Sequence, residues 1–210
     1  MKQQIPTIWV TGPWSSGSTA LTGWLGYLGA YGCPPYQTTN DPRTPNSYES
    51  KALRDKLCEC RNELTLETNR GYENFDFSEW FKQWKKEQQD IAIKQGKKFL
   101  VLKHPLLAFY ISSLVTDIDQ ILLITRPLSA IENTRKRRKW HTTYGSNGAK
   151  ILYTRLINTF INEALAYQAV PYPKFLSDTS YRKDLAKSLR ISTDEHNWYN
   201  AENWIRNGTK

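Results

Sequence analysis

Residues 8–19 of the chain read IWVTGPWSSGST, an apolar and largely β-branched run followed by a loop with two glycines and four hydroxyl side chains. The run, residues 8–11, predicts a buried strand that ends at Gly12. The apolar residues after the loop recur at the spacing of one helix face: Leu21, Trp24, Leu25 and Leu28. A strand, a loop and a helix in this order point backbone N–H groups and a helix N-terminus at one spot, which is a geometry that binds phosphate.

The rest of the chain alternates in the same way between apolar strands and helical segments. Further strands are expected at 99–102, 120–125 and 173–176, and helices at 47–64, 78–95, 106–115, from 129 onward, along 152–164 and at 180–189. Ser78 is the expected N-cap of helix 78–95 and Gly96 its stop. Residues 33–47, rich in Pro, Asn, Thr and Asp, predict a long surface loop. Wholly apolar strands between helices indicate a parallel sheet covered on both faces, so we expect one α/β domain over residues 1–210.

The composition indicates a globular protein with an anionic partner. Lys and Arg number 29 against 20 acidic residues, and the net charge of +9 favours a nucleotide, a nucleic acid, or a sulfated or phosphorylated substrate. No apolar run approaches the length of a membrane span, and no signal-peptide pattern opens the chain. The odd number of cysteines (Cys33, Cys58 and Cys60) favours reduced, structural thiols. These features predict a cytoplasmic protein without a membrane partner.

Polar or cationic side chains follow three predicted strands at the point where each strand ends. They are the loop 12–19, the sequence Lys103-His104-Pro105, and Arg126. Ligands of parallel α/β sheets bind beyond the carboxyl ends of the strands. We therefore expect these three segments to share one site.

Two functions of different classes agree with a phosphate-binding loop at this place. The first is a P-loop small-molecule kinase. Loop 12–19 matches the P-loop template G-x-x-x-x-G-K-[ST] at both glycines and at Thr19, but Ser18 stands where the lysine belongs. Such a kinase also needs an Asp that holds Mg²⁺, and no Asp closes any of the three strands. A non-catalytic nucleotide- or nucleic-acid-binding protein is the second alternative, because the run 134–140 (TRKRRKW) is strongly basic. More often such a run is the solvated face of a helix, so we consider nucleic acid the less favoured partner.

The loop also resembles the 5′-phosphosulfate loop of the sulfotransferase family, whose usual form is P-[KR]-S-G-T-[TS]. Residues 16–19 correspond to S-G-T-[TS], with Ser at position 18; Trp14 stands at the Pro, and Ser15 replaces the Lys or Arg. The resemblance implies a P-loop-type α/β architecture and an enzyme that transfers a sulfuryl group from 3′-phosphoadenosine 5′-phosphosulfate (PAPS) to a hydroxyl or amine. The product would be 3′,5′-ADP, and no metal would be needed. The loop residues implied to bind the donor are Ser15, Ser16, Gly17, Ser18 and Thr19.

The other two strand ends extend this resemblance. Arg126 corresponds to the arginine of the family's 3′-phosphate motif, and Thr134 stands at its serine eight residues later. Lys103 is similar to the lysine that neutralises the transferring sulfuryl group, and His104, one residue later, is the candidate base. Arg206 in Arg206-Asn207-Gly208 is similar to the family's R-K-G segment at the 3′-phosphate. Residues 33–95 match no pattern and are expected to build the acceptor pocket, with the acceptor itself unknown.

Overall fold

A parallel sheet of five strands runs through the residues that the structure describes, 4–39 and 46–207, in a computed structural model. In order across the sheet, the strands are β2 (Ala30–Tyr31), β5 (Phe99–Lys103), β1 (Thr7–Thr11), β6 (Gln120–Thr125) and β7 (Gln168–Pro171). All four pairings are parallel. The central strand β1 is completely buried. The strands that follow it lie first on one side of it, β2 and β5, and then on the other side, β6 and β7. The crevice for ligands in such a sheet therefore lies beyond the carboxyl end of β1.

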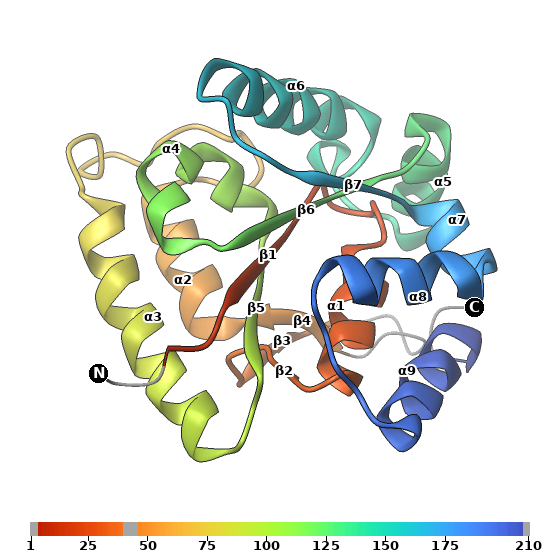
Figure 1. The fold of residues 1–210 in the computed structure, drawn as a ribbon. Coiled ribbons are helices and arrows are strands. Elements are labelled where there is room, and N and C mark those ends of the chain that lie inside the picture. The colour runs from red at the N-terminus through yellow and green to blue at the C-terminus, as the bar shows by residue number, and fades with distance from the viewer. Residues whose placement is uncertain (1–3, 40–45, 208–210) are drawn as a thin grey trace.

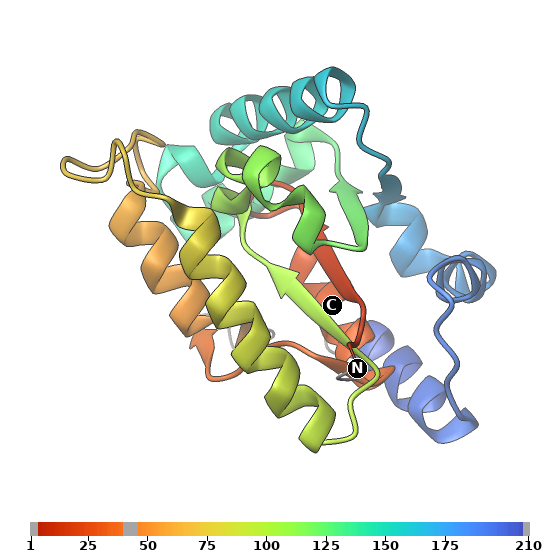
Figure 2. The same cartoon turned by 60° about the vertical axis from the view of Figure 1, so that its left-hand side comes forward.

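Helices cover both faces of the sheet, as Figure 1 shows. One face carries α2 (Lys51–Cys60), α3 (Phe77–Lys94), the short α4 (Ile111–Leu114) and α6 (Ser146–Asn162), and the other carries α1 (Ser18–Tyr27), α7 (Tyr172–Ser177), α8 (Thr179–Ser188) and α9 (Glu195–Asn207). In Figure 2, α2 and α3 lie side by side in front of the sheet. Strand residues alternate between the two cores: Trp9 faces the first group, whereas Ile8 and Val10 face the second.

The remaining elements connect these layers. A small antiparallel hairpin, β3 (Tyr36–Thr38) with β4 (Asn46–Ser50), precedes α2, and α5 (Leu128–Arg138) follows β6. Single 3₁₀ turns occupy Pro105–Phe109, Val115–Asp117 and Thr142–Tyr144. Within the described residues, no helix combines the length and the apolar content that a bilayer crossing demands.

The structure confirms the α/β class and the parallel sheet, with strands at 8–11, 99–102 and 120–125 and a helix after the first loop. The expected strand at 173–176 is wrong. The last strand is β7, and residues 173–176 lie in α7, because a proline is well tolerated in the first turn of a helix. The expected loop at 33–47 is wrong in part, since it contributes the hairpin; residues 40–45 lie outside the described residues.

Helix boundaries also differ from the sequence prediction. The first four residues of the expected helix 47–64 do not belong to a helix, because β4 extends to Ser50 and α2 begins at Lys51. Asp76, and not Ser78, caps α3: its carboxylate accepts hydrogen bonds from the backbone N–H groups of Ser78 and Glu79. The segment 106–115 is broken into a 3₁₀ turn and one short helical turn. Ala164 lies beyond the end of α6, and α9 has no counterpart in the sequence prediction.

Candidate active site

The three strand ends meet on one cavity at the carboxyl edge of the sheet, with a volume of about 550 Å³. Its wall includes the loop after β1, Lys103 at the end of β5, and Arg126 after β6. The register explains this convergence, because Val10 of β1 pairs with Lys103 and Thr11 pairs with Leu123 two residues before the end of β6. The other lining residues come from the hairpin, α2, α5 and the turn after it: Gln37, Thr38, Thr39, Ser47, Glu49, Arg54, Glu63, Thr134, Arg137, Arg138, Trp140 and Tyr144.

The loop after β1 has the backbone that a phosphate-binding loop needs. Gly17, with φ of +101°, is the N-cap of α1, and no side chain among the described residues caps this helix. The Ala20 N–H donates to the Gly17 carbonyl oxygen at 3.0 Å. The N–H groups of Ser18 and Thr19, the first two residues of the helix, have no intrahelical acceptor and remain available to an anion. A Cβ on Gly17 would lie 2.1 Å from the ring of Tyr172, so a side chain there is excluded by both space and backbone conformation.

The placement of the loop residues differs from one to the next. Ser15, Gly17, Ser18 and Thr19 line the cavity. Ser16 is fully buried behind them, and its hydroxyl has no hydrogen-bond partner among the described residues. Its side chain therefore lies outside the cavity wall.

Lys103 and Glu49 form a buried ion pair at the centre of the cavity. The Lys103 ammonium lies 3.1 Å from Glu49 Oε1 and also donates to Thr19 Oγ1 (3.0 Å) and to the Ser47 carbonyl oxygen (2.6 Å). The two side chains are only 4% and 11% exposed. Thr19 links this pair to the phosphate-binding loop, and β4 supplies Glu49. An ammonium, a carboxylate and a helix N-terminus thus lie within one small space.

Burial sets the pKa values of this pair in opposite ways. Loss of water would raise the pKa of Glu49, but Lys103, with help from Arg54, outweighs that effect and lowers it below its usual value. Desolvation lowers the pKa of Lys103, although Glu49 opposes this change. The carboxylate is therefore ionised at neutral pH, and its negative charge depends on the ammonium beside it.

Arg126 follows β6 and so lines the cavity wall across β1 from Lys103, and Thr134 of α5 lines the cavity as well. The Arg126 guanidinium donates to the Ser15 carbonyl oxygen at 2.8 Å and stands 4.8 Å from the centre of the Tyr172 ring. Thr134 is 8% exposed, and its hydroxyl donates to the Ala130 carbonyl oxygen one turn earlier. Both residues line the cavity.

His104 lies beneath the cavity and not on its wall. The ring is 1% exposed, and its Nδ1 accepts a hydrogen bond from the backbone N–H of Leu106 at 3.2 Å. A neutral ring that accepts at Nδ1 carries its proton on Nε2. Burial also lowers the pKa of His104. The residue that sequence analysis selects as base is therefore a neutral ring without a lone pair facing substrate.

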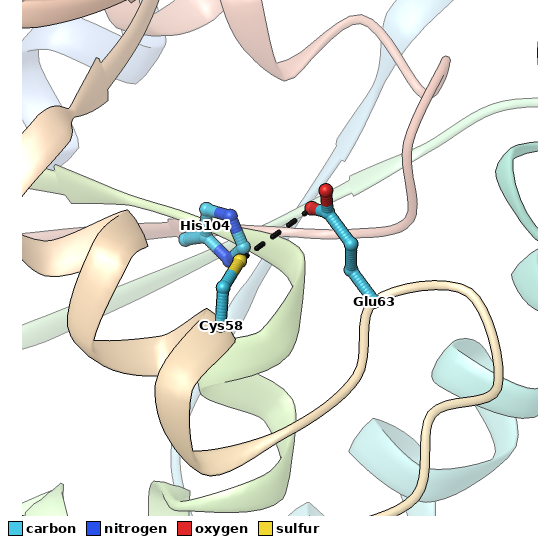
Figure 3. Close-up of side chains that lie close together, drawn as sticks. All are labelled: Cys58, Glu63 and His104. Carbon is cyan, nitrogen blue, oxygen red and sulfur yellow. Dashed lines mark hydrogen bonds between the residues drawn. The ribbon is translucent and has the colours of Figure 1, made fainter. Parts of the chain in front are cut away.

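The side chain of His104 lies beside those of Cys58 and Glu63, as Figure 3 shows. The donor atoms of these three residues lie within 4.8 Å of one another, and the Cys58 thiol donates to Glu63 at 3.7 Å. A metal ion would need the lone pair of Nε2, which the hydrogen bond from Leu106 leaves protonated. Burial, with a further contribution from Glu63, raises the pKa of the Cys58 thiol to about 12. This protonation pattern does not suit a metal ion. Cys58 and Glu63 are joined by their hydrogen bond, whereas His104 Nε2 has no hydrogen-bond partner among the described residues.

Arg206, the remaining candidate, lies away from the cavity. It is an exposed residue in the last turn of α9, a helix that packs on α1. Gly208 of the same segment lies outside the described residues. In the described arrangement, Arg206 does not join the residues that line the site.

Sequence analysis missed several residues of this cavity, above all Glu49. Position 49 lies in the segment 47–64, predicted to be a helix, whereas the structure places it in β4, which pairs with β3, and its carboxylate lies next to Lys103. Two arginines of the basic run, Arg137 and Arg138, also line the cavity, although a solvated face was the expected role of this run. Lys136 and Lys139 of the same run are exposed, as expected.

Comparisons with known proteins support the architecture. No protein-family model matches the chain, and no curated protein matches its sequence. Among solved structures, the sulfotransferase STF1 from Mycobacterium tuberculosis H37Rv is similar with a TM-score of 0.55 and 14% identity, over 96% of this chain and 71% of that one. The sulfotransferase domain of the olefin synthase from Synechococcus PCC 7002 has a TM-score of 0.55 and 15% identity, over 94% of this chain and 78% of that one. At these identities the likeness shows a shared α/β fold.

Proposed function

We propose that this protein is a sulfotransferase that moves a sulfuryl group from PAPS to a hydroxyl or amine acceptor. The observation that carries the proposal is the convergence of a phosphate-binding loop, Lys103 and Arg126 on one cavity. The shared fold with two sulfotransferase structures supports it. A 3′-phosphate and a 5′-phosphosulfate are two separate anionic groups, and the cavity offers cationic or N–H donors on two walls.

In this proposal the two walls hold the two ends of the donor. The first-turn N–H groups of α1, with the hydroxyls of Ser18 and Thr19, bind the 5′-phosphosulfate. Arg126 and Thr134 bind the 3′-phosphate: the guanidinium donates to its oxygens, and the Thr134 hydroxyl turns its one proton from the Ala130 carbonyl oxygen to the phosphate. These contacts position the donor and take no part in bond breaking.

The transfer step is an in-line displacement at sulfur. The acceptor oxygen or nitrogen attacks the sulfur atom while the bond from sulfur to the bridging phosphate oxygen breaks. The electron pair of that bond leaves on the 5′-phosphate of 3′,5′-ADP, and the acceptor proton passes to a base. Lys103 faces the sulfuryl oxygens and stabilises the charge that develops there. In this scheme, side chains and backbone N–H groups stabilise each charge that develops in this step, so we propose that the transfer runs without added metal.

We propose Glu49 as the base in place of His104. Glu49 lines the cavity next to Lys103, whereas His104 is buried below it with a proton on Nε2. When the sulfuryl group engages Lys103, the carboxylate loses the partner that keeps its pKa low. Burial then raises its pKa, so the donor itself makes Glu49 a stronger base.

A titration with three nucleotides tests this function. The protein should bind 3′,5′-ADP more tightly than 5′-AMP, which differs only by the missing 3′-phosphate. One charge-assisted contact contributes about 1.5–3 kcal/mol, so the ratio should be roughly tenfold to hundredfold. Arg126→Ala should remove most of this preference and leave 5′-AMP binding nearly unchanged, as measured by calorimetry.

The same titration separates the rival functions. Equal affinity for 3′,5′-ADP and 5′-AMP contradicts a PAPS site. ATP binding that depends on Mg²⁺ would instead favour a P-loop kinase.

An activity assay tests the transfer itself. Labelled PAPS is offered with a panel of hydroxyl and amine acceptors in the presence of a chelator. Transfer of label to an acceptor under these conditions supports the proposal.

A further inference from the structure

Position 15 of the phosphate-binding loop carries no charge, although a phosphosulfate site gathers negative charge at this place. Ser15 lines the cavity, with a positive φ of 62°, and its hydroxyl donates to the Tyr144 carbonyl oxygen at 3.2 Å. Arg126, which bonds the Ser15 carbonyl oxygen, is assigned above to the other phosphate. The phosphate that leaves in the transfer step therefore needs a cation from another element.

The end of α5 brings an arginine to the same cavity. Thr134 and Arg138 are four residues apart on this helix, so their side chains lie on one face, one turn from each other. Both line the cavity together with Ser15 and Lys103. The positive charge of Arg138 is close enough to contribute to the lowered pKa of Lys103. Arg138 thus lines the same cavity as Lys103, although it belongs to a run expected to be a solvated helix face.

The turn after α5 is fixed directly onto position 15. The Arg138 guanidinium stands 4.5 Å from the centre of the Trp140 ring, and Trp140 packs edge-on against Tyr144 at 5.9 Å. Tyr144 in turn packs against Trp14 at 4.9 Å, and its carbonyl oxygen accepts the hydrogen bond from Ser15. One chain of contacts therefore runs from Arg138 to Ser15 and sets the distance between α5 and the loop.

We propose that Arg138 supplies the cation that loop position 15 lacks and contacts the 5′-phosphate that leaves during sulfuryl transfer. This inference rests on the proposed function. As the bond between sulfur and the bridging oxygen breaks, the electron pair moves onto that phosphate, and the guanidinium stabilises the added charge. The contact strengthens as the charge develops, so it acts mainly on kcat.

Charge rescue is the sharpest test of this arrangement. Arg138→Ala should lower kcat by about a hundredfold, the effect of losing one preorganised donor to developing charge, with a smaller change in the KM for PAPS. Introducing Ser15→Lys into the Arg138→Ala protein should restore at least tenfold of that loss. Lys136→Ala is the matched control, because it removes one positive charge from an exposed position of the same helix, and it should leave kcat unchanged. Arg138→Lys keeps the charge and should retain part of the activity.

Nucleotide affinities show which phosphate Arg138 contacts, and they can be measured without turnover. Arg138→Ala should weaken 3′,5′-ADP and 5′-AMP by the same factor, because both carry the 5′-phosphate, and so leave their affinity ratio intact. A lower ratio of 3′,5′-ADP affinity to 5′-AMP affinity would place Arg138 at the 3′-phosphate and overturn the inference. Unchanged affinity for both nucleotides would also overturn it. So would a Ser15→Lys change that restores no activity to a folded Arg138→Ala protein. If the unmutated protein shows no preference for 3′,5′-ADP, the proposed function fails first, and the two failures are distinguished.

Discussion

Glu49 shows how one residue depends on its partner for its chemistry. Its carboxylate is buried, and the ion pair with Lys103 keeps it charged. Glu49→Gln keeps the shape and removes the proton acceptor. If Glu49 is the base, transfer should fall by about 10²–10⁴-fold, while 3′,5′-ADP binding changes little. Single-turnover transfer from labelled PAPS, together with calorimetry on the same protein, measures both quantities.

The matched control is His104→Asn. Asparagine retains an acceptor for the Leu106 N–H group, as an N-cap residue does, but it removes the imidazole. This variant should keep most of its activity. An inactive His104→Asn protein that binds 3′,5′-ADP normally, beside an active Glu49→Gln protein, would contradict our assignment and return the role of base to His104.

The same ion pair predicts how the rate depends on pH. The pKa of Glu49 in the free protein is lowered, so the carboxylate stays ionised as the pH falls to its usual range near 4.5. The value of kcat/KM, which reports the free enzyme, should hold its level until the pH is below that range. Once the donor engages Lys103, the pKa of Glu49 rises, so the acid limb of kcat should lie at higher pH than that of kcat/KM. Coinciding limbs would mean that donor binding leaves the pair intact.

At the scale of elements, α8 and α9 are joined by a buried ion pair between Arg182 and Glu202. The two side chains are each 3% exposed, and the Arg182 guanidinium donates to both carboxylate oxygens at 2.7 and 2.5 Å. Burial would raise the pKa of Glu202, but Arg182 outweighs it and lowers this pKa. A carboxylate with a lowered pKa in the folded state stabilises the fold above its unfolded pKa, and this stabilisation is lost as the pH falls.

Glu202→Gln should therefore destabilise the protein by about 3–5 kcal/mol near pH 7, because it leaves the Arg182 charge buried without its partner. The difference from the unmutated protein should shrink below about pH 4.5, where the unmutated protein loses the same pair. Urea unfolding at several pH values measures it. The control is Asp55→Asn, which breaks an exposed i, i+4 pair with Lys51 and should cost under about 1 kcal/mol. Equal losses of unfolding free energy in the two variants at pH 7 would show that the buried pair stabilises the fold no more than the exposed pair does.

The elements that sequence patterns predict well are those whose burial is complete. β1, β5, β6 and α1 are apolar along their length or along one full face, so their periodicity alone identifies them. The edge strands β2 and β7 have two and four residues and gain their structure from pairing with a neighbour. No local pattern marks such strands, and the same holds for the hairpin that carries Glu49.

The candidate site also has a part that the sequence predicts and a part that it does not. The order strand, loop and helix places Thr19, Lys103 and Arg126 at one edge of a parallel sheet, which the chain order alone predicts. The position of His104 below the cavity depends on the 3₁₀ turn that follows β5, and the positions of Glu49 and Arg138 depend on long-range packing. Tertiary contacts thus decide which residues next to a predictable strand end face the ligand. The roles assigned to these residues stay predictions.

At the scale of the whole molecule, the net charge is +9, and the cavity gathers part of the positive charge on a few groups. Lys103, Arg126, Arg137 and Arg138 line the cavity, and the carboxylates that line it among the described residues, Glu49 and Glu63, each lie next to a cation. A small nucleotide with two phosphate groups that enters the cavity meets fixed charges at short range. A long polyanion would instead meet exposed charges such as Lys136 and Lys139, which salt screens.

This contrast predicts how salt separates the two kinds of ligand. Between 0.05 and 0.5 M KCl, where the screening length falls several-fold, 3′,5′-ADP affinity should drop by roughly tenfold, because groups inside the cavity are only partly screened. A single-stranded oligonucleotide of about ten residues contacts many exposed charges, so its affinity should fall by roughly a thousandfold or more. At 0.2 M KCl, 3′,5′-ADP should resist displacement by the oligonucleotide in a fluorescence competition assay. An oligonucleotide that still displaces the nucleotide at this salt concentration would contradict the sulfotransferase proposal and favour a nucleic-acid-binding protein, because the basic run would then outweigh the cavity in choosing the ligand.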